Sequence, residues 1–100
     1  MKLCKLISEK AENNYFVIDD EETYLMASIK ILSDGRARMI YRRKDDSIPR
    51  IEEHSSLNDA YSVFRSVCDT DKKIYICPID YMKKHGPGPF SLETVVNNDN

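Results

Sequence analysis

The stretch that decides the fold is residues 23–43, which read TYLMASIKIL, SDG and RARMIYRR. Residues 23–32 alternate apolar and other side chains, with Leu25, Ala27 and Ile29 on one side, and residues 36–43 alternate in the same way. Period-two alternation is typical of strands that bury one face. The stretch therefore predicts two antiparallel strands joined by a short loop.

The length of that loop decides which side chains share a face, because a slip of one residue exchanges the faces. A two-residue loop would set Ile31 opposite the charged Arg38. A three-residue loop pairs Ile31 with Ala37 and Lys30 with Arg38, which separates apolar from charged positions. It also places Gly35 at the left-handed position of a turn with a bulge, which glycine adopts without steric cost. We therefore predict a three-residue loop.

The chain around this hairpin predicts two earlier strands and one helix. Residues 2–8 and 15–19 are short β-prone runs separated by a polar turn. Residues 45–54 read as a loose connection, after which Ser56 can cap a helix. An apolar stripe at helical spacing follows, and the helix is expected to end near residues 69–71.

After the helix, residues 73–79 read as a further strand, which Pro78 either confines to an edge or ends. Residues 81–84 predict a single helical turn and residues 86–90 a stiff turn. Residues 91–96 predict a short strand or a turn of helix.

Together these elements predict an α+β fold. It consists of an antiparallel four-stranded meander, one amphipathic helix packed on one face and a further strand after it, in the order β-β-β-β-α-β. A chain of 100 residues has room for one core. We therefore expect one domain over residues 1–96 and a frayed polar tail over residues 97–100.

Composition limits the compartment and the class of protein. The 15 basic and 17 acidic residues give a net charge of -2, which argues against a protein that coats nucleic acid over its whole surface. Cys4, Cys68 and Cys77 are odd in number and lack Cys-x-x-Cys spacing, so neither a disulfide framework nor a zinc ribbon is indicated. No signal peptide or membrane-spanning run is evident. We expect a cytoplasmic protein that does not bind membranes.

The outward face of the hairpin carries the strongest functional signal, a stripe of cations with aliphatic and methionine side chains among them. Methionine and arginine are enriched where proteins bind one another. The candidate partner-binding residues are Met26, Lys30, Leu32, Arg36, Arg38, Ile40, Arg42 and Arg43. The competing interpretation is a solvated face whose charge is balanced by Asp45, Asp46 or the acidic run at residues 19–22.

Catalysis, a metal and a cofactor are not expected. Cys68 lies near a helix C-terminus, where the dipole opposes a thiolate, and His54 and His85 lack paired ligand spacing. No carboxylate pair suggests a general acid and base, and the chain has only three glycines and no phosphate-binding loop. The acidic run lacks the spacing of a calcium loop and reads as a solvated turn.

The aromatic side chains are expected mainly inside the molecule. Tyr61, Tyr75 and Tyr81 are predicted in or near the core. Phe90 is either an exposed anchor or folds back over the sheet edge, and the second arrangement is favoured.

These observations predict a small, non-catalytic cytosolic binding protein, an inhibitor, adaptor or regulator of the phage type. It would occupy a protein partner through the hairpin face or through an edge strand, and the same edge could form a homodimer. The alternative is a nucleic-acid-binding module with phosphate contacts from Lys30, Arg36, Arg38, Arg42, Arg43 and Lys44. That alternative lacks a base-stacking platform, because Tyr41 points to the apolar face. A weaker third alternative is a small enzyme whose pocket forms between subunits.

Overall fold

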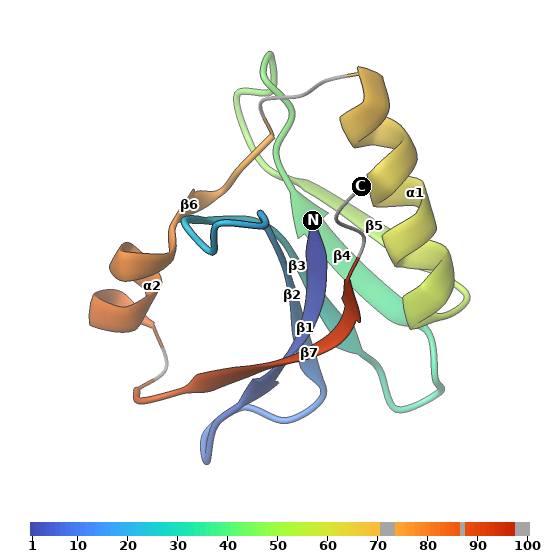
Figure 1. Cartoon of the computed structure of the whole chain (residues 1–100). Coiled ribbons are helices and arrows are strands. Elements are labelled where there is room, and N and C mark those ends of the chain that lie inside the picture. The colour runs from blue at the N-terminus through green and yellow to red at the C-terminus, as the bar shows by residue number, and fades with distance from the viewer. Residues whose placement is uncertain (71–73, 87, 98–100) are drawn as a thin grey trace.

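A computed structural model describes residues 1–70, 74–86 and 88–97 of the chain. In this part an antiparallel sheet carries one helix on each face (Figure 1). The elements are β1 (Lys2–Ile7), β2 (Asn14–Ile18), β3 (Tyr24–Ile31), β4 (Ala37–Tyr41), β5 (Arg50–His54), α1 (Leu57–Thr70), β6 (Cys77–Pro78), α2 (Ile79–His85) and β7 (Ser91–Asn97). The strand order is β5-β4-β3-β2-β1-β7, and the short β6 pairs with β3. The predicted α+β class is confirmed.

The central hairpin has the predicted register. Ile31 pairs with Ala37 and Lys30 with Arg38, as a three-residue loop requires. Gly35 has a φ of 88°, in the left-handed region, and its amide donates to the carbonyl of Leu32 at 2.9 Å. The turn therefore forms as the sequence predicts.

The segment expected to be a loose connection contains β5, which pairs with β4 along its whole length. Its side chains are mostly charged, so it lacks the apolar alternation of a half-buried strand. Backbone pairing is supported by the Tyr41 hydroxyl, which donates to Glu52 Oε2 at 2.8 Å. Burial, and then this bond, raise the pKa of Tyr41, so the hydroxyl stays a donor at neutral pH.

The chain after α1 differs in detail from the prediction. Of the strand expected over residues 73–79, the described part contains only Cys77–Pro78, and Pro78 is also the N-cap residue of α2. Residues 91–97 form the strand β7, which adds to β1. Asn97 is the last residue of β7, and the other residues of the expected tail lie outside the described part, as do residues 71–73 and 87.

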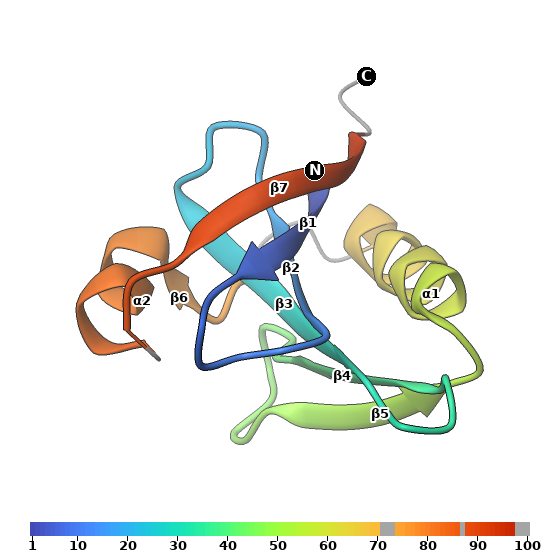
Figure 2. The same ribbon diagram turned by 90° about the horizontal axis from the view of Figure 1, so that it is seen from below.

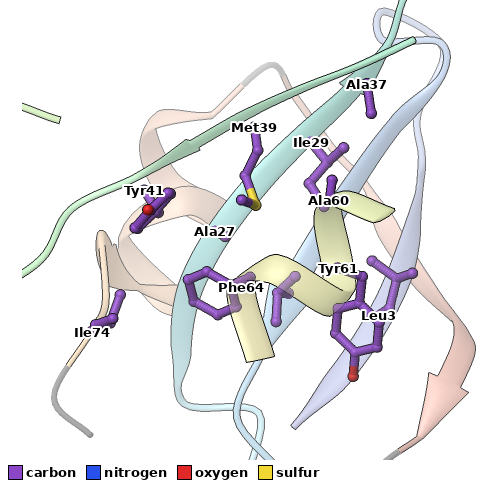
Figure 3. Packing of buried hydrophobic residues seen from close by; sticks show 11 residues of the cluster. Leu3, Ala27, Ile29, Ala37, Met39, Tyr41, Ala60, Tyr61, Phe64 and Ile74 are labelled. Carbon is purple, nitrogen blue, oxygen red and sulfur yellow. The ribbon is translucent and has the colours of Figure 1, made fainter. Parts of the chain in front are cut away.

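Helix α1 begins and packs as its sequence predicts. The amide of Asp59 donates to Ser56 Oγ at 3.1 Å, which satisfies an otherwise free amide at the first turn. On the side facing the sheet, the Phe64 ring lies edge-on to Tyr41 with centroids 5.5 Å apart. Phe64 and Tyr41 belong to a first cluster of buried hydrophobic side chains. It comprises Leu3, Val17, Ala27, Ile29, Ala37, Met39, Tyr41, Ala60, Tyr61, Phe64 and Ile74 (Figure 3).

The opposite face of the sheet buries a second cluster, over β1 and β2. Successive residues of a strand point to opposite faces, so Leu3 joins the first cluster and Cys4 the second. The second cluster comprises Cys4, Leu6, Phe16, Ile18, Leu25 and Ile79, against which Met82, Phe90 and Leu92 pack. Phe90 lies edge-on to Phe16 with centroids 6.2 Å apart. Phe90 therefore folds back onto the sheet, but it covers the face over β2 and not, as expected, the sheet edge beside residues 73–79.

A bulge in β3 changes the predicted faces at one end of this strand. Val17 pairs with Ala27, but Ile18 pairs with Leu25, so Met26 has no partner across the strand pair. The extra residue shifts the alternation. Leu25 consequently belongs to the second cluster, and Met26 packs against the first. The expectation that Leu25 shares a face with Ala27 is wrong for this reason.

Candidate binding surface

The faces of β3, β4 and β5 that point away from α1 form an exposed surface. The register aligns Lys30 with Arg38 and Arg38 with Glu53, and it sets Ile40 between Ser28 and Ile51. Helix α2 lies beside β6 and away from β5 (Figure 2). We call this surface the open face and define it by Ser28, Lys30, Arg38, Ile40, Ile51 and Glu53.

The centre of the open face is aliphatic. Ile51 is 66% exposed, and its partner Ile40 is half-buried. The hydrophobic contribution to stability scales with the apolar area removed from water. An isoleucine that is two-thirds exposed therefore contributes little to the stability of the isolated chain. A partner that covered Ile51 would gain that contribution.

Charged side chains surround this aliphatic centre. Lys30 and Arg38 are cross-strand partners of like charge, a pairing that destabilises the sheet slightly. Arg38 Nη2 lies 4.0 Å from Glu53 Oε1, and both side chains are largely exposed, so this ion pair adds little to stability. Glu53 comes from β5, the strand that sequence reasoning missed. The balancing acid on the open face is therefore Glu53, and the excess of positive charge there is smaller than predicted.

The structure separates Met26 from this surface and places the other predicted site residues at the two ends of the β3–β4 hairpin. Met26 turns away because of the bulge and lines a hollow with Met1, Cys68 and acidic residues of the run at residues 19–22. The predicted position of Met26 beside the hairpin cations is wrong. Leu32 and Arg36 meet at the hairpin loop, where the Leu32 amide donates to the Arg36 carbonyl at 2.8 Å.

Arg42 and Arg43 belong to the loop between β4 and β5, which Asp46 organises. The carboxylate of Asp46 accepts from Arg50 Nε at 2.8 Å and Nη2 at 3.2 Å, and from the Arg43 amide at 3.0 Å. The Asp46 carbonyl accepts from Arg42 Nε at 3.0 Å. The hydrogen bonds from Arg50, and then from Arg43, lower the pKa of Asp46. Asp46 thus balances the charge of Arg50 and holds the loop.

A second surface lies at the end of β4 and is lined by residues distant in sequence. A hollow of about 360 Å³ is bounded by Arg42, Arg43, Lys44, Tyr75 and Ile76. The Tyr75 ring packs on that of Tyr24 with centroids 4.8 Å apart and an angle of 38° between planes. Tyr75 is 51% exposed, so its predicted place in or near the core is wrong. Tyr81, at 55% exposed, is also outside the core.

The acidic run at residues 19–22 forms a turn in which the carboxylates of Asp19 and Asp20 have partners within the chain. Asp19 Oδ1 accepts from the amides of Thr23 at 2.8 Å and Tyr24 at 2.7 Å. Asp20 Oδ1 lies 2.8 Å from the N-terminal amino group. These contacts explain the run structurally, as a turn that leads into β3.

Two of the three thiols, Cys4 and Cys77, are poorly suited to act as nucleophiles. Burial raises the pKa of Cys4 and of Cys77, which favours the protonated thiol, the weaker nucleophile. His54 Nε2 lies 3.1 Å from Glu52 Oε1 within β5. Over the described ranges, no group of three or more histidine, cysteine, aspartate or glutamate side chains could hold a metal ion.

Comparisons of the chain with protein-family models, with curated proteins and with solved structures give no match. Neither described helix is long and apolar enough to cross a membrane.

Proposed function

We propose that this chain is a non-catalytic protein that binds the surface of a protein partner through the open face. The exposure of Ile51 beside Ile40 carries the proposal, because it places an uncovered aliphatic centre inside a charged rim. Protein interfaces have this organisation, with a desolvated apolar core and a polar rim. Lys30 and Arg38 exceed Glu53 in charge, which favours a partner with an acidic rim around an apolar site.

The face of the sheet is better suited to this role than its edges. The edge strand β5 has charged Arg50, Glu52 and Glu53 and follows Pro49, features that protect an edge from pairing with another strand. The other edge, β7, has an irregular register where it pairs with Leu3 and Cys4. Such irregularities also discourage strand addition. These features favour the open face over strand addition or a homodimer through an edge.

A reducing compartment suits this function. Cys4, Cys68 and Cys77 are free thiols, and Cys4 is buried within the second cluster. Thiols in this state are typical of cytosolic proteins. We therefore propose that the protein acts in the cytosol as an inhibitor, adaptor or regulator of its partner.

The proposal is tested by quantitative capture of partners from a lysate of the cells in which the protein occurs. Ile51→Glu and Arg38→Glu should each reduce the captured partner at least tenfold, because each places an unfavourable charge against the partner's complementary site. Val95→Glu and Arg65→Glu are matched controls, since Val95 is exposed on β7 and Arg65 on α1. Both controls should capture the partner as the parent chain does.

Capture that is unchanged by both open-face variants would refute the proposal. Circular dichroism on all four variants checks that each remains folded. Loss of capture in the Val95→Glu control alone would assign binding to the β7 edge instead.

A further inference from the structure

We propose that the hollow lined by Arg42, Arg43, Lys44, Tyr75 and Ile76, here called the basic groove, binds single-stranded nucleic acid through phosphate contacts and one stacked base. This inference is independent of partner binding by the open face, because other side chains carry it.

The basic groove lies where β4 and β6 pair with successive parts of β3. β4 pairs with β3 as far as Tyr41 and Ala27, and its chain then leaves the sheet. Beyond that point the edge of β3 is taken by the segment leading into β6, where the Ile76 amide donates to the Leu25 carbonyl at 2.7 Å. The departing end of β4 and this incoming segment form the two walls of the groove.

One wall supplies positive charge. Arg42, Arg43 and Lys44 are consecutive, and all three line the groove. In the same loop, the Asp46 carboxylate accepts two hydrogen bonds from Arg50, of 2.8 and 3.2 Å, and one of 3.0 Å from the Arg43 amide. Arg50 does not line the groove, so part of the negative charge of Asp46 is balanced by a cation outside it. Arg42 uses Nε to hold the Asp46 carbonyl, and a guanidinium has five N–H donors, so donors are left for a phosphate.

The other wall supplies an aromatic face. Tyr75 is half-exposed, and its ring is supported by Tyr24. A ring that is already held in place loses little rotational freedom when a base stacks on it. Cations that follow the backbone, combined with an aromatic platform for a base, are the elements of single-strand recognition without sequence preference.

The size of the groove fits one nucleotide unit. Its volume of about 360 Å³ is at the lower end of the range for small-ligand sites, about 300–1,000 Å³. The groove is open to solvent, which leaves room for a strand to continue beyond the bound nucleotide. This geometry suits a chain of nucleotides that is clamped at one position.

The test is fluorescence anisotropy of a labelled 12-nucleotide oligothymidine with the 100-residue chain, at low and at moderate salt. We expect binding whose affinity falls steeply as salt rises. Tyr75→Ala should weaken binding about tenfold, and Tyr75→Phe should retain it because the stacking ring remains. Arg42→Glu should weaken binding more than Tyr75→Ala, since it replaces a phosphate donor with a repelling carboxylate.

The molecule offers a close control for the aromatic substitution. Tyr81 is exposed to a similar extent and packs on His85 with centroids 4.6 Å apart and an angle of 39°, nearly the geometry of Tyr75 on Tyr24. Tyr81→Ala should leave the affinity unchanged. Ile51→Glu should likewise retain oligonucleotide binding, which separates this site from the open face.

Two results would overturn the proposal. The first is no binding of oligothymidine at low salt by the folded parent chain. The second is equal binding of oligothymidine and of dextran sulfate, with no loss in Tyr75→Ala, which would show a general polyanion surface without base stacking. Thermal unfolding of each variant identifies any substitution that acts by unfolding the chain.

Discussion

The face of the sheet that lies away from α1 has two halves, one covered and one open. Over β1 and β2 it buries Phe16 and Ile18 beneath Phe90 and the start of α2. Over β3 to β5 the same face leaves Ile51 and Lys30 in solvent. Both halves belong to one continuous antiparallel sheet. What differs is the later chain, because α2 and Phe90 pack over the first half.

Local alternation decides which side chains of a strand share a face, except at the bulge in β3, whereas distant segments decide whether that face is covered. The difference in cover also predicts different energetics for the two halves. The stability of the covered half should depend on side-chain packing, and the stability of the open half should depend on its turns and strand pairing. Three sets of substitutions test this contrast.

The largest effect is expected from truncating an aromatic ring in the covered half. Phe16→Ala removes a buried ring that contacts Phe90 and should lower the free energy of unfolding by about 3–5 kcal/mol. Ile51→Ala, in the open half, should change it by about 0.5 kcal/mol or less. Urea unfolding followed by circular dichroism measures both. A large loss in Ile51→Ala would show that the open half is covered in solution.

A smaller effect is expected at the loop that sets the register of the open half. Gly35→Ala should cost about 1–2 kcal/mol, because alanine resists the left-handed backbone at φ 88°. The added methyl group has open space around it, so the cost is conformational and not steric. Gly35→Asn should cost less, because asparagine tolerates this conformation. Equal stability of the alanine variant and the parent would contradict the turn geometry.

The smallest effect is expected at Asp46, which holds the second loop of the open half. Its pKa is lower in the folded chain than in the unfolded one, so its contribution to stability is complete above the ordinary aspartate pKa. That contribution is lost as the pH falls through the lowered value. Asp46→Asn should therefore unfold at a slightly lower temperature at pH 7 and match the parent in strong acid. Thermal melts across pH measure this, with Asp45→Asn as a control that makes the same change of charge at the neighbouring position.

The elements that sequence reasoning predicted well are those defined by neighbouring residues. The three-residue turn follows from alternation on both sides of Gly35, and the start of α1 follows from Ser56 and the apolar stripe after it. In each case the residues that determine the structure lie within a few positions of one another. Local propensity was then sufficient.

The features that were missed depend on contacts between distant segments. β5 is mostly charged, and it forms because β4 offers an edge and Tyr41 a hydrogen bond. The position of Met26 depends on a register shift against β2, which the sequence of β3 does not encode alone. Tyr75 lies near the cations around Arg42 because β4 and the segment leading into β6 both pair with β3. The aromatic wall of the basic groove therefore could not be predicted from the pattern of any single segment.

The pairing of β1 with β7 has a consequence for how the chain folds. These strands bring together Cys4 and Thr94, which are 90 positions apart. Closing so long a loop costs conformational entropy before the contacts between the two strands can form, and such long-range pairings slow folding. As the chain is synthesised, β1 emerges before the other strands described here and its partner β7 after them. The covered half of the sheet therefore stays incomplete, with one side of β1 unpaired, until β7 has been made.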